Sequence, residues 1–225
     1  MSDGTAFLFD LDGTLVDSVY EHVLAWRRAL EEVGIDLSVW RIHRRIGMSG
    51  GLFINALLRE TETGVTTEQV ERIQTLHAQA YQTLVAQVRP LPGARELLTT
   101  LSAAGVPWAI ATSGRWEVAR PVLETLGVPD GVPIVTRDQV LHAKPDPDLF
   151  LVAAERLGVS IEASVVVGDS IWDLLAARRA RALGVGLLSG GYGRAELETA
   201  GAYRVYEDPA DLLFHLDEVG VRGAV

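Results

Sequence analysis

The 225-residue sequence predicts an α/β fold: a Rossmann-like, three-layer core in which helices cover both faces of a parallel sheet. Residues 6–9 are apolar without alternation, which is typical of a strand buried on both faces. From residue 90 onward, short apolar segments alternate with helical patterns, the order that produces parallel sheets. Between these parts, residues 17–89 show helical patterns only, which predicts an all-helical cap domain inserted into the core.

The core elements follow from the apolar segments and from the glycines and prolines that separate them. Gly105 and Gly127 each follow a helical pattern where glycine commonly ends a helix, and Pro147 stands in the first turn of another. In order, we expect a strand at 6–9, a helix at 94–104, a strand at 108–111, a helix at 117–126, a strand at 133–135, a helix at 147–157, a strand at 164–167, a helix at 171–183, strands at 186–188 and 203–205, and a helix at 209–216.

The predicted cap begins just after the first strand. Asp17 or Ser18 can cap its first helix, after which apolar residues recur at helical spacing. We expect cap helices at 19–33, 38–45, 52–59 and 67–88, with a glycine-rich loop at 47–51. The core would then comprise residues 1–16 and 90–225, and the cap residues 17–89. Both ends of the cap lie near the end of the first strand, so the cap is placed to cover that end.

Composition argues against several classes of partner. Hydrophobic residues are 48% and charged residues 22%, as in ordinary globular proteins, and the net charge of −10 argues against nucleic acids or anionic membranes as partners. There are no cysteines, hence no disulfides. The amino-terminal residues lack the pattern of a secretory leader, and no stretch approaches the roughly 18 apolar residues of a membrane span. We therefore expect a cytoplasmic protein, and a monomer.

Polar side chains follow three of the predicted strands. Asp10 and Asp12 follow the first, and Thr112 and Ser113 follow the second. Asp169 follows a later one. Each has a simpler explanation, as an acidic turn, a polar turn or the cap of the next helix. Because parallel strands bring their carboxyl ends to one edge, where open α/β sheets bind ligands, their joint occurrence predicts a site.

The residue types at this edge suit phosphoryl chemistry. Asp10, Asp12 and Asp169 would form an oxygen-rich site suited to Mg²⁺. Hydroxyl and backbone N–H groups after the second strand, together with Lys144, suit a phosphoryl group. One carboxylate acting as nucleophile and another as general acid and base would divide a displacement into two steps. Lys144 and Asp173 also have a simpler explanation, as solvated surface residues.

With these residues in this order, the sequence resembles the haloacid dehalogenase superfamily, in particular its phosphatases and phosphomutases with a helical cap. The resemblance spans nearly the whole chain. It rests on four motifs: Asp10-Leu11-Asp12-Gly13-Thr14, Thr112 at the end of a hydrophobic strand, Lys144-Pro145, and Gly168-Asp169-Ser170-Ile171-Trp172-Asp173.

The resemblance implies a role for each charged residue. Asp10 would attack phosphorus and form an aspartyl-phosphate, and Asp12 would protonate the leaving oxygen and then deprotonate water. Lys144 would neutralise charge on Asp10 and on the phosphoryl oxygens. Mg²⁺ would bind to Asp10, to the backbone carbonyl of Asp12 and directly to Asp169. Asp173 would bind it through water or orient the other ligands.

The resemblance also implies residues that contact the substrate. Thr112, Ser113 and Gly114 would bind the phosphoryl group. In the cap, His22 stands four residues before Trp26, as in β-phosphoglucomutase-like proteins and several sugar phosphatases, where the histidine lies near the leaving group. Burial among the apolar residues of the cap is the alternative for both. The loop that begins at Gly47 resembles the one by which such caps touch substrate.

Three features distinguish among activities of this superfamily. Asp12 favours phosphoryl transfer, because the pattern of haloacid dehalogenases lacks an aspartate there. The cap contains no lysine, which argues against the Schiff-base chemistry of phosphonate hydrolases. Gly50 stands about where the mutase has an arginine, which argues against mutase activity. We therefore expect a Mg²⁺-dependent phosphomonoester hydrolase of a small phosphorylated metabolite, such as a phosphosugar or phosphoglycolate. The alternatives are a β-phosphoglucomutase-like mutase, a non-catalytic binding protein and a haloacid dehalogenase.

Overall fold

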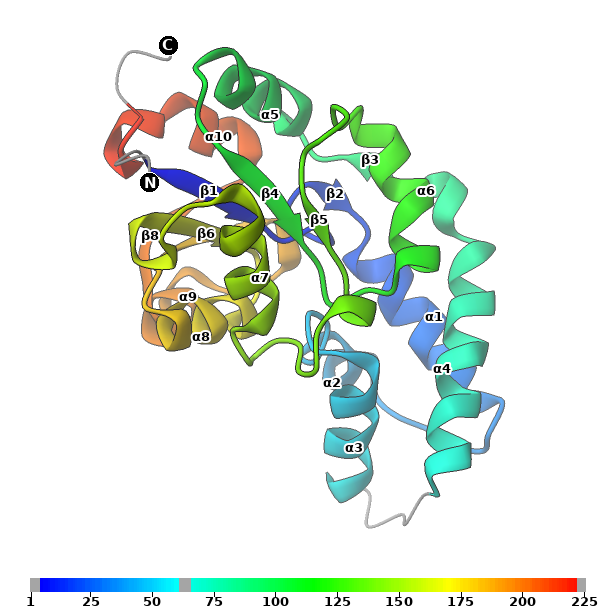
Figure 1. Cartoon of the computed structure of the whole chain (residues 1–225). Helices are drawn as coiled ribbons and strands as arrows, with labels where there is room; N and C mark the ends of the chain where they lie inside the picture. The colour runs from blue at the N-terminus through cyan, green and yellow to red at the C-terminus, as the bar shows by residue number, and fades with distance from the viewer. Residues whose placement is uncertain (1–4, 61–65, 222–225) are drawn as a thin grey trace.

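A six-stranded parallel sheet forms the centre of the protein in the computed structural model, which describes residues 5–60 and 66–221 (Figure 1). Its strands are β1 (Ala6–Phe9), β4 (Trp108–Ala111), β5 (Ile134–Val135), β6 (Ser164–Gly168), β7 (Leu183–Leu187) and β8 (Ala202–Tyr206). Their order is β5–β4–β1–β6–β7–β8, so β1 lies between β4 and β6. Within this register Leu8 lies opposite Ala109 on one side and Val166 on the other.

Helices cover both faces of the sheet and complete the three layers. The core helices are α5 (Ala94–Ala103), α6 (Trp116–Leu126), α7 (Asp148–Leu157), α8 (Ile171–Ala180), α9 (Arg194–Ala200) and α10 (Pro209–Phe214). Phe7 and Phe9 share an apolar cluster with α5, α6 and α10, whereas Leu8 belongs to the cluster with α7 and α8. Successive residues of β1 thus bury their side chains on opposite faces, which explains why this strand is apolar without alternation.

The cap consists of four helices inserted between β1 and α5, and it has an apolar core of its own. The helices are α1 (Val19–Glu31), α2 (Val39–His43), α3 (Gly50–Glu60) and α4 (Thr67–Gln82). α1 and α4 lie side by side (Figure 1), with Trp26, Phe53 and Ile73 buried among the cap helices. The two connections to the core pair with each other as antiparallel strands β2 (Val16–Asp17) and β3 (Arg89–Pro90).

Short 3₁₀ helices complete the described secondary structure. They occupy Val85–Gln87, Arg137–Gln139, Ile161–Ala163, Leu188–Gly190 and Leu216–Val219. Within residues 5–60 and 66–221, none of the helices is long and apolar enough to cross a membrane.

The predicted fold class is confirmed, and individual elements differ from their predicted bounds. The helix expected at 171–183 ends at Ala180, because Arg181 adopts the left-handed conformation with φ 61°. β7 accordingly begins at Leu183 rather than at 186. α3 begins at Gly50, inside the loop expected at 47–51. α9, β2 and β3 were not predicted: α9 has only seven residues, and the two short strands exist only through their mutual pairing.

Candidate active site

The carboxyl ends of β4, β1 and β6 lie side by side because these strands are neighbours in the sheet. Asp10 directly follows β1, Thr112 follows β4 and Asp169 follows β6. All three side chains are buried. The sheet therefore brings together the polar residues that the sequence places at the ends of three separate strands, at the edge where open α/β sheets bind ligands.

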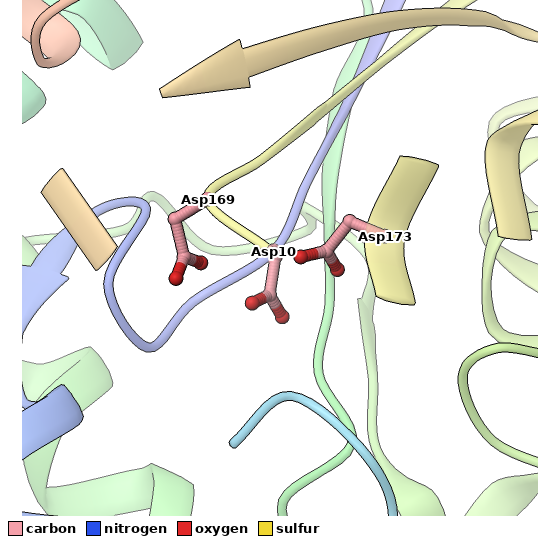
Figure 2. A group of neighbouring side chains, drawn as sticks. All are labelled: Asp10, Asp169 and Asp173. Carbon is pink, nitrogen blue, oxygen red and sulfur yellow. The ribbon is translucent and has the colours of Figure 1, made fainter. Parts of the chain in front are cut away.

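Three buried carboxylates form an acidic cluster at this edge. Asp10, Asp169 and Asp173 each offer one oxygen, and these oxygens lie within 4.8 Å of one another. Figure 2 shows the side chains converging from three segments of the chain: the end of β1, the end of β6 and the first turn of α8. Carboxylate oxygens grouped in this way are the ligands that Mg²⁺ prefers. The side chain of Asp12 is not part of this group, which leaves its backbone carbonyl as the predicted ligand.

Lys144 places one positive charge beside the acidic cluster. It is the single lysine of the chain and is completely buried. Its ammonium group donates a hydrogen bond to Asp10 and lies 2.9 Å from Asp173 Oδ1. Burial lowers the pKa of Lys144, but Asp10 and Asp173 outweigh this effect and raise the pKa above its usual value. Burial also raises the pKa of Asp10, to about 7, against the opposing effect of Lys144.

Neighbouring groups hold the other two carboxylates of the cluster. Thr14 donates to Asp169 Oδ1 at 2.9 Å. The hydroxyl and the backbone N–H of Ser170 donate to Asp173 Oδ2 at 2.5 and 3.1 Å. Ser170 is the N-cap of α8, so the alternative explanation of Asp169 as a helix cap is wrong. The alternative of solvated surface residues is equally wrong for Asp173 and Lys144, which are fully buried.

The charge balance of the cluster fits a divalent cation. Burial, with the nearby carboxylates of Asp173 and Asp10, raises the pKa of Asp169 well above its usual value. Three carboxylates face a single lysine, so the group carries an excess of negative charge. A hard cation such as Mg²⁺ would relieve this repulsion, and the all-oxygen donor set suits it.

Asp12 lies at the same edge but its side chain faces the cap. Its Oδ1 accepts a hydrogen bond from Ser18 Oγ at 2.6 Å and lies 3.2 Å from His22 Nε2. Burial raises the pKa of Asp12, but His22 and Ser18 outweigh this effect and lower the pKa overall. Ser18 stands at the N-cap of α1 without a capping hydrogen bond from its side chain, so the expected cap is wrong in detail and the hydroxyl orients Asp12 instead.

The loop after β4 presents hydrogen-bond donors to the same edge. The backbone N–H of Gly114 donates to Thr112 Oγ1 at 2.9 Å, which leaves the hydroxyl hydrogen of Thr112 available to donate elsewhere. The Ser113 hydroxyl is buried and has no hydrogen-bond partner among the residues that the structure describes. A buried hydroxyl is costly without a partner, so this loop suits a ligand with several acceptor oxygens.

A cavity of about 720 Å³ separates these core residues from the cap. Its volume is within the range of small-molecule sites. Asp10, Asp12, Thr112, Ser113 and Gly114 all line its core side. The cap side includes His22, Trp26, Gly47, Ser49, Gln74 and His77.

Residues 5–181 match the model of a protein family described as haloacid dehalogenase-like hydrolase. The chain belongs to this family. The predicted family is thereby confirmed for a segment that holds all four motifs of the sequence. A crystal structure of a hydrolase from Pseudomonas syringae is similar, with 57% identity and a TM-score of 0.94, and the match covers 96% of this chain and 100% of that chain.

Curated relatives of this haloacid dehalogenase-like hydrolase carry phosphatase and mutase names. Hexitol phosphatase A of Escherichia coli (strain K12) is 34% identical over 73% of this chain and 74% of its own length. A phosphoglycolate phosphatase of Rhodospirillum rubrum is 32% identical, over 92% of this chain and 88% of its own. Beta-phosphoglucomutase of Bacillus subtilis (strain 168) is 30% identical, over 94% and 92%. Family and relatives together support the expected phosphatase enzyme.

His22, which was predicted near the leaving group, and Trp26, its partner in the cap motif, have different surroundings in this haloacid dehalogenase-like hydrolase. Trp26 is 6% exposed, stacks on Phe53 and belongs to the apolar core of the cap, so burial explains most of its surface. His22 is also buried, yet one ring nitrogen reaches Asp12 of the core. Of the pair, His22 is therefore the residue that links cap and core.

Two glycines of the cap explain how closely its loops approach their neighbours. Gly47 has φ 95°, and a Cβ at this position would lie 2.7 Å from Ser170 Oγ, so the loop touches the core through Gly47 as well as lining the cavity. A Cβ at Gly50 would lie 3.3 Å from the indole of Trp26. Any side chain at this position, such as the arginine of the mutase, therefore requires the indole to shift by a few tenths of an ångström.

His77 was not among the residues predicted for the site, yet its Nε2 lies 3.1 Å from His22 Nδ1. His77 and Tyr81 are buried on α4, whereas the more apolar Leu76 and Ala80 are only partly buried. Hydrophobicity alone therefore places the buried stripe of α4 one residue too early. A histidine and a tyrosine four residues apart were the signal available, because their rings pack together on one helix face.

Proposed function

We propose that this hydrolase is a Mg²⁺-dependent phosphomonoesterase that acts on a small phosphorylated metabolite through an aspartyl-phosphate. One observation supports this most directly. Asp10 and Asp12, two residues apart, border the same cavity but have different surroundings: Asp10 adjoins the acidic cluster and Lys144, and Asp12 adjoins the serine and histidine of the cap side. Two carboxylates with different surroundings suit two different roles.

In the proposed reaction, Asp10 is the nucleophile. One of its oxygens attacks phosphorus, the ester P–O bond breaks, and Asp12 gives its proton to the leaving oxygen. In the second step Asp12 takes a proton from water, the resulting hydroxide attacks phosphorus, and Asp10 leaves. Lys144 keeps Asp10 oriented and offsets negative charge, while Thr112 and Ser113 donate hydrogen bonds to the phosphoryl oxygens.

Mg²⁺ would be held by Asp10, Asp169, the backbone carbonyl of Asp12, and Asp173 directly or through water. When bound, it supplies positive charge that stabilises the phosphoryl oxygens in the transition state. The residues of the core would then orient the ester, and the cap would exclude bulk water from the cavity. The division into a core of residues 1–16 and 90–225 and a cap of residues 17–89 belongs to this proposal.

The names of the relatives support a sugar phosphate, a sugar alcohol phosphate or phosphoglycolate as the substrate. A β-phosphoglucomutase-like activity is the second candidate, since one relative of nearly full length carries that name. Gly50 disfavours it, because this glycine stands about where the mutase has an arginine, and a mutase has to hold a second phosphate. The monomeric state and the cytoplasmic location stay predictions.

The experiment is phosphate release from a panel of esters in the presence of Mg²⁺. The panel contains hexitol, hexose and pentose phosphates, β-glucose 1-phosphate and phosphoglycolate. Selective release from one ester supports the proposal and names the substrate class. Conversion of β-glucose 1-phosphate to glucose 6-phosphate without phosphate release identifies the mutase instead. If no ester undergoes either reaction, the non-catalytic alternative is favoured.

The nucleophile is tested by Asp10→Asn, which removes the attacking charge with little change in shape. We expect phosphate release to fall below detection while circular dichroism and the melting temperature show a folded protein. Asp130→Asn, the same change at an exposed loop aspartate, is the control and should leave the rate unchanged. Normal turnover by Asp10→Asn would contradict the proposed mechanism.

A further inference from the structure

Four aromatic rings of the cap form two stacked pairs, and one pair contains the histidine that reaches Asp12. His22 stacks on Tyr81 with ring centroids 4.0 Å apart, and His77 stacks on Trp26 at 3.9 Å. His22 and Trp26 come from α1, and His77 and Tyr81 from α4, the two long cap helices that lie side by side in Figure 1. Each pair therefore joins one helix to the other.

The two imidazoles meet through their ring nitrogens. His22 Nδ1 lies 3.1 Å from His77 Nε2, while His22 Nε2 lies 3.2 Å from Asp12 Oδ1. Both histidines are 8% exposed. A continuous chain of polar atoms thus runs from α4 through α1 to the carboxylate that has been assigned the acid and base role.

The direction of the hydrogen bonds in this chain follows from Asp12. Asp12 Oδ1 is an acceptor whether the carboxyl group is ionised or carries its proton on Oδ2, so His22 donates to it through Nε2–H. A neutral His22 then has an unprotonated Nδ1 that can only accept, which makes His77 Nε2–H the donor. Burial lowers the pKa of His77 well below its usual value, which keeps that ring neutral with a single N–H.

We propose that His77 is a positioning residue for the acid–base step: by donating to His22 Nδ1 it fixes the tautomer of His22 that holds Asp12 toward the leaving group. This inference rests on the proposed function of Asp12. Without the donor, His22 can carry its proton on Nδ1, and its bare Nε2 then faces the carboxylate. Asp12 would lose one of its two hydrogen bonds, leaving Ser18 alone to orient it.

The competing explanation is that His77 only fills space on Trp26. Two variants separate the hydrogen bond that His77 donates to His22 from the stacking of its ring on Trp26. His77→Phe keeps an aromatic ring on Trp26 and removes the donor, whereas His77→Gln keeps an N–H near the position of Nε2 and removes the ring. His215→Phe is the control, because His215 also stacks on an aromatic ring, that of Tyr206 at 5.6 Å, and lies at the end of α10.

The readout is kcat and KM for two esters with Mg²⁺: the sugar phosphate preferred by the wild type, and p-nitrophenyl phosphate. The sugar alkoxide needs a proton from Asp12 to leave, whereas p-nitrophenolate leaves without one. We expect His77→Phe to lower kcat/KM for the sugar phosphate at least about tenfold and to leave kcat/KM for p-nitrophenyl phosphate within about twofold, because kcat/KM does not include the later water step that the two esters share. His77→Gln should recover most of the loss, and His215→Phe should match the wild type.

The outcomes distinguish this inference from the function on which it rests. If the wild type releases phosphate from neither ester, the proposed function fails. If the wild type is active and His77→Phe either keeps the wild-type kcat/KM or loses kcat/KM to the same extent for both esters, His77 has no role through Asp12. An impaired His77→Gln beside a fully active His77→Phe would assign the effect to stacking on Trp26, and equal impairment of the two variants would overturn the donor role.

A second measurement uses the wild type and does not depend on folding of a variant. Imidazole ¹⁵N spectra of the histidine-labelled protein at neutral pH report which ring nitrogens carry hydrogen. We expect both His22 and His77 as Nε2–H tautomers, with signals assigned by their loss in the variants. A doubly protonated His22, or an Nδ1–H tautomer at either residue, would overturn the inference.

Discussion

At the scale of single residues, the site concentrates negative charge where water is excluded. Asp10, Asp169 and Asp173 are buried within a few ångströms of one another, and Lys144 is the one cation that touches this group within the part of the chain that the structure describes. Buried charges of like sign repel strongly because few dipoles screen them. The lysine therefore stabilises the folded core, and a cation bound beside it would add to this stabilisation.

The contribution of Lys144 is measured by Lys144→Met, which keeps the approximate shape and removes the charge. With chelator present, we expect the free energy of unfolding to fall by roughly 3–5 kcal/mol, because two carboxylates lose their buried partner. Urea denaturation measures it. Arg27→Met is the control: Arg27 pairs with Glu31 on an exposed face of α1 and should cost at most about 0.5 kcal/mol. Equal losses in the two variants would show that Lys144 does not offset the cluster.

Metal binding should stabilise the protein in a pH-dependent way. At 100 times its dissociation constant, Mg²⁺ should add about 2.7 kcal/mol to the stability of the chelator-treated protein, and Asp169→Asn should remove most of this gain. The raised pKa of Asp169 means that its proton stays bound at pH values where an ordinary aspartate is ionised. Because Mg²⁺ has to displace that proton, we expect a smaller rise in melting temperature at pH 5 than at pH 8. A rise that is the same at both pH values, or that survives Asp169→Asn, would place the ion elsewhere.

The sequence predicted the core half of this site better than the cap half. Asp10, Thr112 and Asp169 follow strands, so their convergence depends only on a parallel sheet, which the alternating pattern of elements predicts. His77 reaches His22 only through the way in which α4 packs on α1; the four-residue spacing of His77 and Tyr81 indicates a shared helix face but not which way that face turns. The structure describes where the side chains of Asp10, Thr112, Asp169 and His77 lie, whereas the catalytic and binding roles of these residues stay predictions.

At the scale of elements, the loop from α2 to α3 determines how the cap meets the core. The backbone carbonyl of Arg44 accepts hydrogen bonds from Tyr192 Oη at 2.7 Å and from Trp172 Nε1 at 3.3 Å. Three residues later, Gly47 lies against Ser170 at the start of α8. Ser170 in turn holds Asp173, so this loop touches the acidic cluster through one intermediate side chain.

A methyl group at Gly47 should therefore lower activity. Gly47→Ala strains a backbone with φ 95° and places Cβ 2.7 Å from Ser170 Oγ, so the loop has to move away from the core. We expect kcat/KM to fall at least about tenfold while global stability falls by only about 1 kcal/mol. Steady-state kinetics and urea denaturation measure the two quantities.

The control for Gly47 is Gly34→Ala. Gly34 also has a positive φ, 79°, but nothing lies within 4 Å of a Cβ at that position. It should show a similar loss of stability with unchanged kcat/KM. If both variants lose activity to the same extent, the effect comes from backbone strain in the cap and not from contact with Ser170.

The elements that the sequence failed to predict share a physical cause: tertiary contacts determine them. Arg181 ends α8 in a left-handed conformation that glycine usually adopts, so the expected signal is missing. The strand was expected to begin only at Gly186, yet Gly184 also lies inside β7, and a Cβ at Gly184 would come within 3.1 Å of Leu174 and one at Gly186 within 3.0 Å of Leu197. Here glycine allows helices to approach the sheet closely rather than allowing the chain to turn.

At the scale of the whole molecule, a small set of contacts holds the cap over the cavity. His43 Nε2 lies 2.8 Å from the carbonyl oxygen of Gly190, and Arg44 forms an ion pair with Glu196 on α9. Together with the hydrogen bonds that Tyr192 and Trp172 donate to Arg44, these contacts join α2 of the cap to α8 and α9 of the core. α9, which the sequence did not predict, is thus part of the surface on which the cap rests.

This arrangement predicts that two hydrogen bonds to one carbonyl act as a unit. Tyr192→Phe and Trp172→Phe each leave the other donor on the carbonyl of Arg44, so each single variant should keep kcat/KM within about twofold of the wild type. The double variant leaves the carbonyl without either donor, and we expect a loss of at least about tenfold, larger than the product of the single effects. Small-angle scattering should show a larger radius of gyration for the double variant only. Tyr203→Phe, an exposed tyrosine on β8, is the control. Single effects that simply multiply, with an unchanged radius, would mean that the cap stays closed through the remaining contacts of His43 and Glu196.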